Sequence, residues 1–93
     1  MCIPKWKINA LEDWNMWHQG VIGAPVNGKM IACKYWVKAF DKGSKWGIKG
    51  GRISKLTIEV NGKTTCNYDR GWDIKPEDEA TQKAFAILMY EYN

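Results

Sequence analysis

Apolar and polar residues alternate most clearly over residues 30–40. One set of alternate positions is apolar enough for a core: Ile31, Cys33, Tyr35, Val37 and Ala39. The other set interleaves cations with aromatic rings: Ala32, Lys34, Trp36, Lys38 and Phe40. Successive side chains of a β-strand point to opposite faces of the sheet. The pattern therefore predicts a strand with one core face and one basic, aromatic face.

Three further strands are predicted around this one. Residues 14–22 are rich in aromatic and β-branched side chains, which favour a first strand. Residues 52–60 and 64–68 continue the alternation and predict the third and fourth strands. The connections carry turn chemistry: Gly23 to Lys29, the glycine-rich loop from Asp41 to Gly51, and the turn from Asp69 to Asp73.

Asn61-Gly62 is a strong hairpin signal between the last two strands. A two-residue turn would leave Cys66 and Tyr68 on the polar face, because a slip of one residue moves every side chain to the other face. A three-residue loop, with Gly62 left-handed and a bulge, instead places Leu56 near Cys66. We expect the second arrangement, since it keeps one apolar face.

Residues 74–92 are predicted to form a C-terminal helix, with Pro76 in its first turn. Three carboxylates follow at the positive end of the helix dipole: Glu77, Asp78 and Glu79. The predicted apolar stripe is Ala80, Ala84, Ile87 and Leu88, with Phe85 and Tyr92 at its margin. The expected fold is a single α+β domain over 1–93. In it, a four-stranded antiparallel sheet (14–68) is packed by one helix and preceded by an arm (1–13).

Composition bounds the class of protein. The 93 residues are 45% hydrophobic and 26% charged, which is typical of a globular domain with one modest core. The three cysteines are an odd count, and no apolar run suits a signal peptide or a membrane span. We expect free thiols, with Cys33 and Cys66 buried, a cytoplasmic location and no membrane partner.

Tryptophan and charge are both unusual. Six tryptophans are hard to bury in so short a chain, so exposed aromatic surface is expected. The net charge is +4, and the segment 34–55 holds seven cations and one anion. From Asp69 onward there are six anions and three cations. The chain is therefore electrically polarised.

The basic segment yields the main candidate site. Glycine-rich backbone can present N–H groups to an anion, and nearby cations add charge-assisted bonds. The candidate anion-binding residues are Lys42, Lys45, Lys49, Arg52 and Lys55. Neither a Walker A nor a Rossmann spacing is present. The alternative is a long sheet connection that needs glycine for its bends and lysine for solubility.

Aromatic stacking would accompany the anion contacts. Trp36 and Trp46 are the candidate stacking residues, and Lys34 and Lys38 flank Trp36 on its strand face. Interleaved cations and aromatic rings hold single-stranded nucleic acids through phosphate contact and base stacking. The alternative is a half-buried Trp36 with lysine stems packed along its ring.

The segment Asp69, Arg70, Gly71, Trp72, Asp73 has a catalytic and a structural interpretation. An acid–base role for its carboxylates is conceivable, but a structural turn fits better. In that turn Gly71 supplies the bend, and Asp73 precedes or caps the helix. Arg70 forms a local ion pair, and Trp72 packs between the helix and the sheet. His18 is the one histidine, so we expect no metal site, no cofactor and no enzymatic activity.

Two motifs carry a resemblance: Gly-Ile-Lys-Gly-Gly-Arg-Ile-Ser-Lys-Leu at 47–56 and Tyr-Asp-Arg-Gly-Trp-Asp at 68–73, followed by the helix. Over residues 14–93 the chain resembles a family of small uncharacterised proteins encoded by phages and conjugative elements of Gram-positive bacteria. The resemblance implies a mobile-element accessory protein. Such genes often encode anti-defence factors, including proteins that block CRISPR nucleases or sequester signalling nucleotides.

Three functional hypotheses follow from these patterns. The first is a non-enzymatic module that binds an anionic partner, nucleic acid or a nucleotide, through the basic loop and sheet face. The second is an inhibitor, such as an anti-CRISPR protein, that contacts a host defence protein. The third is a structural domain that forms a homodimer through its open sheet face.

Overall fold

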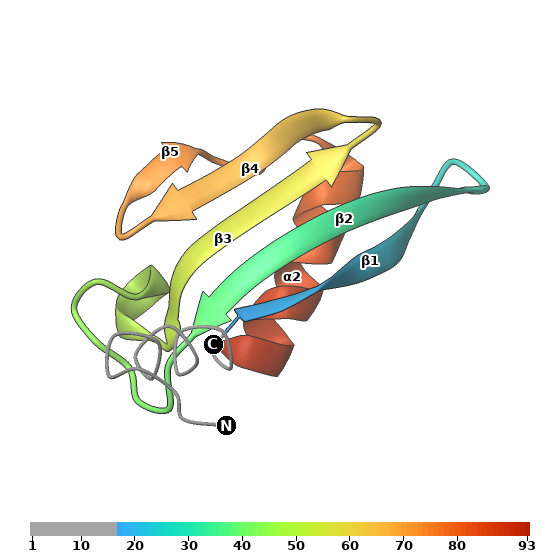
Figure 1. Cartoon of the computed structure of the whole chain (residues 1–93). Helices are drawn as coiled ribbons and strands as arrows, with labels where there is room; N and C mark the ends of the chain where they lie inside the picture. Colours follow the sequence, from blue (N-terminus) through green and yellow to red (C-terminus); the bar gives the residue numbers. More distant parts are fainter. Residues whose placement is uncertain (1–16) are drawn as a thin grey trace, which may run out of the picture.

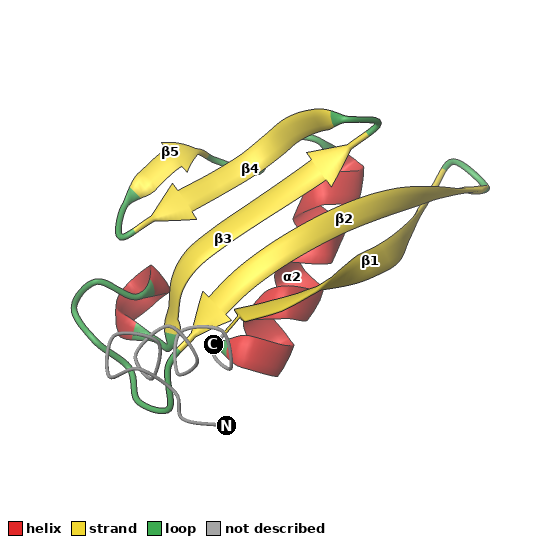
Figure 2. Ribbon diagram, viewed as in Figure 1, coloured by secondary structure: helices red, strands yellow, loops and turns green. Residues whose placement is uncertain are grey.

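The computed structural model describes residues 17–93, which form a five-stranded antiparallel sheet with one α-helix packed on one face (Figures 1 and 2). The strands follow chain order across the sheet: β1 (Trp17–Val26), β2 (Lys29–Ala39), β3 (Ile53–Val60), β4 (Lys63–Asp69) and β5 (Trp72–Ile74). A short 3₁₀ turn, η1 (Ile48–Gly50), lies in the loop before β3, and α2 spans Glu79–Tyr92. The expected α+β class is confirmed, but the sheet has five strands, not four. The predicted arm (1–13) and residues 14–16 of the predicted first strand lie outside the described residues.

The fifth strand lies in a segment that the sequence predicted as a turn. Arg70, with φ of 57°, reverses the chain, and Trp72 then pairs with Tyr68 on β4. The bend was predicted at Gly71, but the residue with positive φ is Arg70. Trp72 contacts Tyr68 edge-on at 5.1 Å between ring centroids and Phe85 of α2 at 5.6 Å, as its predicted packing role requires. Asp73 belongs to β5 and does not cap the helix.

The helix therefore begins later than predicted. Asp78 is its N-cap, and its side chain accepts a hydrogen bond from the N–H of Thr81 at 2.9 Å. This bond satisfies one of the N–H groups that have no partner within the helix. Residues 74–78 consequently complete β5 and lead into the helix instead of forming its first turn.

The β3–β4 hairpin corrects the predicted register. Asn61 and Gly62 both have positive φ, at 54° and 77°, so the turn has two residues and not three. A two-residue turn alone would shift the register of β4 by one residue, and a bulge next to the turn compensates for this shift. Glu59 pairs with Thr64 but Ile58 pairs with Cys66, and this leaves Thr65 as the extra residue. The apolar face is thus preserved by a bulge inside the strand.

The β1–β2 hairpin turns at Asn27 and Gly28, which also both have positive φ. The turn is shorter than the predicted 23–29, because β1 continues through Pro25. Proline is tolerated there since β1 is an edge strand, where the missing N–H breaks no ladder bond. The carbonyl of Pro25 instead accepts a hydrogen bond from the ammonium group of Lys83 on α2.

The core lies between the sheet and α2. From the strands it takes buried side chains that include Val37, Leu56, Ile58 and Cys66, and from the helix Ala80, Ala84 and Leu88. Ile87, predicted in the helix stripe, is 41% exposed, and Thr81 is buried in its place. The Thr81 hydroxyl donates to Asp78 Oδ1 at 2.6 Å and lies 2.7 Å from the hydroxyl of Thr65. These contacts satisfy the hydrogen-bonding capacity of the buried hydroxyl. Thr81 can therefore lie on the buried side of α2, while Ile87 faces outward.

Cys33 and Cys66 are buried free cysteines, as predicted. Burial raises the pKa of the Cys66 thiol to about 12, and the Asp78 carboxylate adds to the effect. The pKa of Cys33 is raised by the same two causes in the same order. Both thiols therefore remain protonated near neutral pH, and they serve as small apolar core groups.

Among residues 17–93, no helix has the length and apolar character that a membrane crossing requires.

Candidate functional site

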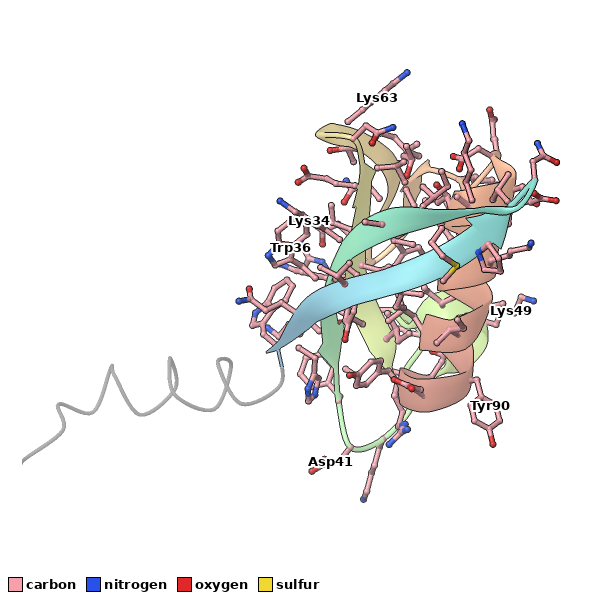
Figure 3. The ribbon with its side chains drawn as sticks, turned by 90° about the vertical axis from the view of Figure 1, so that its right-hand side faces the viewer. Lys34, Trp36, Asp41, Lys49, Lys63 and Tyr90 are labelled. Atoms are coloured by element: carbon pink, nitrogen blue, oxygen red, sulfur yellow. The ribbon has the colours of Figure 1, made fainter. Side chains whose placement is uncertain are left out.

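The face of the sheet opposite α2 carries the predicted Lys34 and Trp36 side chains (Figure 3). We call this surface the open face. Strand pairing arranges its side chains in cross-strand rows. The three rows are Trp17–Lys38–Lys55–Asp69, Gln19–Trp36–Thr57–Asn67 and Val21–Lys34–Glu59–Thr64. Aromatic rings and lysines lie mainly on β1 and β2, and the carboxylates lie on β3 to β5.

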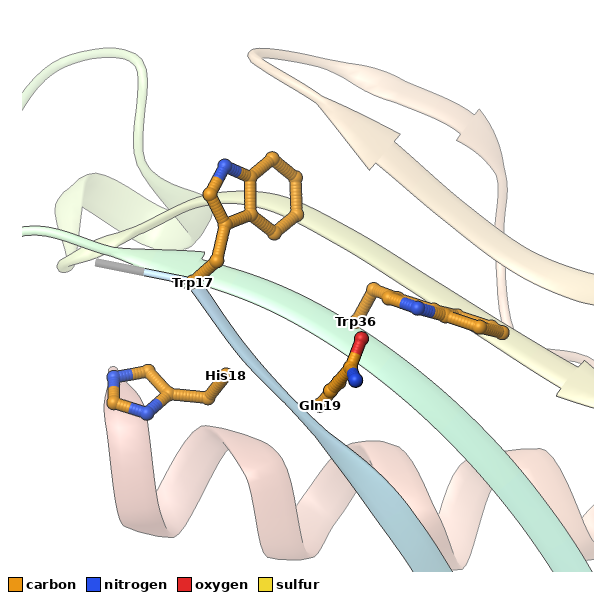
Figure 4. Close-up of a pocket in the computed structure, with 4 residues that line it drawn as sticks. All are labelled: Trp17, His18, Gln19 and Trp36. Atoms are coloured by element: carbon orange, nitrogen blue, oxygen red, sulfur yellow. The ribbon is translucent and has the colours of Figure 1, made fainter. Parts of the chain in front are cut away.

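Two tryptophans on neighbouring strands of the open face line a hollow. Trp17 and Trp36 rise from the same side of the sheet, and Gln19 lies beside Trp36 (Figure 4). We call this hollow the indole cleft. His18 also adjoins it, but its ring lies toward α2, where it stacks on Tyr92 at 4.7 Å between centroids. The cleft therefore presents two flat rings and one amide side chain.

A chain of hydrogen bonds crosses the other half of the open face. The Thr57 hydroxyl donates to Asn67 Oδ1 at 2.9 Å, and Asn67 Nδ2 donates to Asp73 Oδ2 at 3.0 Å. These bonds tie β3, β4 and β5 together through their side chains. They also pair the polar groups of Thr57, Asn67 and Asp73 with one another.

A second hollow lies at the end of the open face, against the loop that precedes β3. It has a volume of about 260 Å³ and is lined by Lys38, Phe40, Ser44, Trp46, Ser54, Lys55 and Arg70. We call it the basic pocket. Asp69 partly offsets its charge, with Oδ1 at 3.9 Å from Lys55 Nζ and 3.4 Å from Arg70 Nε. Lys38, Lys55 and Arg70 thus bring cations to the lining of the pocket, and Asp69 brings a carboxylate beside two of them.

Trp46 is held at the rim of the basic pocket by its backbone. The Tyr68 hydroxyl donates to the Trp46 carbonyl at 2.8 Å, and the Trp46 N–H donates to Ser44 Oγ at 3.3 Å. The Trp46 side chain remains 53% exposed, with Lys45 Nζ 4.8 Å from its ring centroid. The ring is thus fixed at its base and accessible at its face.

A family model matches residues 16–93, and it describes a domain of unknown function, DUF7678. The chain belongs to the DUF7678 family. A search of the curated proteins and a search of the solved structures each found no match.

The DUF7678 domain does not gather all five predicted anion-binding cations. Lys55 lines the basic pocket, and Lys45 adjoins it through Trp46. Lys42 and Arg52 are exposed on the loop. Lys49 lies on the α2 side, away from Lys34 and Trp36 (Figure 3). The predicted stacking residues are also divided: Trp36 belongs to the indole cleft and Trp46 to the basic pocket.

In the glycine-rich loop of the DUF7678 domain, four backbone N–H groups form hydrogen bonds within the loop itself. The N–H groups of Ser44, Gly47, Gly50 and Gly51 donate to carbonyls within residues 44–51, at 2.9 to 3.2 Å. Two glycines are needed for close packing: a Cβ on Gly43 would lie 2.5 Å from the Gly50 carbonyl, and one on Gly47 only 1.8 Å from that of Gly51. These amides are therefore not aimed at an anion, and the cationic side chains are what the site offers.

Sequence reasoning missed several residues of these hollows, including Gln19, which was given no role. Trp17 was predicted within the first strand, but not opposite Lys38. Phe40 was placed on the open face without a role, although Lys38 Nζ lies 5.3 Å from its ring centroid. Arg70 was assigned only to the turn and to local pairing. Its contact with Asp69 bears out the local pairing, and it also lines the basic pocket.

The described residues contain no group of three or more His, Cys, Asp or Glu side chains arranged to hold a metal ion.

Proposed function

We propose that this DUF7678 domain is a non-enzymatic module that binds single-stranded nucleic acid along the β1–β2 side of its open face. The observation that carries the proposal is the placement of Trp17 and Trp36 on adjacent strands of one face, with Lys38 paired to Trp17 and with Lys34 and Lys38 on either side of Trp36 along β2. Proteins that bind single strands combine a cationic track with rings on which bases stack.

The indole cleft supplies the stacking surface. A sheet places rings of neighbouring strands within reach of one another, and an unpaired base offers a flat face to either ring. The amide of Gln19, beside Trp36, can donate to and accept from a base edge. Stacking on Trp36 is expected to supply about 1–3 kcal/mol per base.

Charge supports a path along β2. Lys34 and Lys38 lie on either side of Trp36 on the same strand face. The carboxylates of Glu59 and Asp69 occupy the neighbouring strands, where they would repel phosphates. A nucleic-acid strand is therefore favoured over β1 and β2 and disfavoured over β4 and β5.

The test is binding of a fluorescent single-stranded oligonucleotide, followed by anisotropy at low and moderate salt. Trp36→Ala is expected to weaken binding about tenfold or more. Lys34→Gln is expected to weaken it and to reduce the salt dependence by about one unit of slope. Tyr90→Ala is the matched control, because Tyr90 is 92% exposed on the α2 side of the molecule (Figure 3). Absence of binding at low salt contradicts the proposal.

A second candidate function is contact with a protein partner, as for an anti-defence inhibitor encoded by a mobile element. Exposed apolar side chains on the open face favour it: Val21 is 60% exposed and Met30 is 69% exposed. The far end of the β1–β2 hairpin, which carries Met30, extends beyond α2 (Figure 1). Recovery of one stoichiometric protein from host lysate after nuclease treatment supports this function, and light scattering distinguishes it from homodimer formation.

A further inference from the structure

We propose that the outer edge of β1 pairs with the same edge of a second copy of this chain, so that two domains share one continuous antiparallel sheet. The inference goes beyond the proposed function and does not depend on it. β1 is an outermost strand, and within residues 17–93 no strand pairs with it on the side away from β2. Figure 3 views the molecule from this side. An unpaired strand edge presents a row of N–H and C=O groups that another strand can bind.

The two edges of the sheet differ in how they are protected from such pairing. Edge strands are normally kept short, bent by a bulge, or given charged residues or proline. β5 has three residues and carries Asp73 at its centre. β1 has ten residues, pairs with β2 without a bulge, and contains no Lys, Arg, Asp or Glu. Its one proline, Pro25, lies near its end, so most of the strand is open to pairing.

The hairpin turn determines which backbone groups of β1 point outward. A two-residue turn closes on a hydrogen-bonded pair, here Val26 with Lys29. Along an antiparallel ladder, such pairs alternate with non-hydrogen-bonded pairs, whose N–H and C=O groups point away from the partner strand. The hydrogen bond from Lys83 to the Pro25 carbonyl agrees with this assignment, because Pro25 belongs to the second kind. The other outward-pointing residues are Trp17, Gln19, Val21 and Gly23.

One register lets two copies use all of these other residues. It places a twofold axis at Gly20, so that each contact is formed twice. The resulting pairs are Trp17 with Gly23 and Gln19 with Val21. An axis shifted toward the hairpin would instead bring Trp17 opposite Pro25, which has no N–H to donate. The edge is therefore complementary to itself in the Gly20 register.

The side chains of this register also fit one another on the open face. The Met30 side chain lies across Gly23, with its Cε 2.8 Å from where a Cβ of Gly23 would be. In the paired sheet the Trp17 ring of the second copy lies beside that glycine, where an aromatic side chain stabilises a strand, and it contacts the Met30 thioether. Trp17, Val21 and Met30 are 38%, 60% and 69% exposed within one copy. Pairing covers apolar surface of all three, which favours a second copy as the partner.

The paired sheet joins the two indole clefts. The cross-strand row that holds Trp36 and Gln19 continues through Val21 to Lys34 of the second copy. Glu59 and the other carboxylates of the open face lie on strands farther from the twofold axis. The rings of both copies therefore lie at the centre of one surface, and a second copy supplies a cation to the row of each cleft.

The experiment measures the mass of the wild-type protein by light scattering over a range of concentrations. Twice the mass of one chain, falling on dilution, is expected. Val21→Pro is the decisive variant, because it removes an outward N–H and leaves the β1–β2 ladder intact, as Pro25 does at an equivalent position. It is expected to raise the dimer Kd about thirtyfold or more, since each copy loses a backbone hydrogen bond. Val21→Thr keeps the N–H and the branched shape, and it is expected to change the Kd by less than about fivefold.

A second measurement tests the register and decides the matter if Val21→Pro does not fold. Gln19→Cys and Val21→Cys, each in a Cys2→Ser background, face one another across the twofold axis at a separation that a disulfide can span. Under mild oxidation, a mixture of the two variants is expected to give more cross-linked dimer than either variant alone.

Three results would overturn the inference: a wild-type monomer at all concentrations, equal dimer Kd values for Val21→Pro and Val21→Thr, or a mixture of cysteine variants that gains no cross-linking. The binding of an oligonucleotide decides the proposed function separately. A monomer that binds the oligonucleotide overturns only the inference, and a dimer that does not bind it overturns only the proposed function.

Discussion

Asn93 holds the start of β3 in place through its side chain: Oδ1 accepts a hydrogen bond from the N–H of Ile53 at 3.0 Å. The same amide donates from Nδ2 to the carbonyl of Ile48 at 3.1 Å. A Cβ on Gly51 would lie 2.3 Å from this amide, so the loop passes as close as a glycine permits. The end of α2 thus fixes the loop that carries Trp46.

We expect Asn93→Ala to lower the free energy of unfolding by about 1–3 kcal/mol, because it leaves the N–H of the buried Ile53 without its partner. Urea unfolding followed by tryptophan fluorescence measures the change. Tyr90→Ala, three positions earlier on the exposed side of α2, is the control and is expected to change stability by less than about 0.5 kcal/mol. Equal effects of the two substitutions would show that the Asn93 bonds contribute nothing.

Arg70→Gly is expected to raise the free energy of unfolding by about 1 kcal/mol, since it relieves a left-handed backbone in an L-residue. Arg70→Ala is the matched control. It removes the same guanidinium group and its contact with Asp69 but keeps the backbone strain. Thermal unfolding compares the two variants. If Arg70→Gly is no more stable than Arg70→Ala, the backbone at residue 70 is not strained.

Asp78→Ala is expected to destabilise the domain by about 1 kcal/mol at neutral pH through loss of the helix N-cap. Partial burial opposes the charged form of Asp78, but the hydrogen bonds from Thr81 outweigh it and lower the carboxyl pKa. A lowered folded-state pKa gives stability that is present above the unfolded pKa and lost as the pH falls through the folded one. The difference in Tm between wild type and variant should therefore narrow from pH 6 to pH 3. If the difference in Tm stays constant over this pH range, the Asp78 carboxylate is not the source of the stabilisation.

Alkaline pH is expected to destabilise the domain through Cys66. Its folded-state pKa is about 12, raised by burial, whereas an unfolded cysteine has a pKa of about 8.5. The folded state thus holds the proton more tightly, so stability is full below the unfolded pKa and falls as the pH rises toward 12. Urea midpoints at pH 7 and pH 10 should differ more for the wild type than for Cys66→Ala. If the urea midpoint changes equally in the wild type and in Cys66→Ala, the alkaline destabilisation does not arise from Cys66.

The parts of the fold that local pattern determines were predicted. Strict alternation over residues 30–40 located β2 and both of its faces. The apolar stripe and the carboxylates at 77–79 indicated a C-terminal helix, although it begins at Glu79 and not at residue 74. β5 was missed because it has three residues and depends on the conformation of Arg70. Local turn preferences assign a positive φ to Gly71, and only pairing with β4 places it on Arg70.

The candidate site could likewise be predicted only in part from the sequence. Lys34, Trp36 and Lys38 followed from one strand's alternation. Trp17 required pairing between strands: counting back from the Asn27-Gly28 turn brings it opposite Lys38, but Pro25 made that segment read as loop. The basic pocket depends on a register shift after Lys38 and on the folding of the loop, neither of which has a local signature.

The central claim is that nucleic acid lies on the open face beside Trp17 and Trp36. It is tested most directly by following the tryptophan indole N–H signals by NMR during titration with a single-stranded oligonucleotide at low salt. Single-substitution variants assign the signals. The account predicts that the Trp17 and Trp36 signals shift with the ligand. Trp72, packed against Tyr68 and Phe85 on the α2 side, should stay in place. Saturating binding that moves Trp72 and leaves Trp36 unchanged, or no shift of any signal, would contradict it.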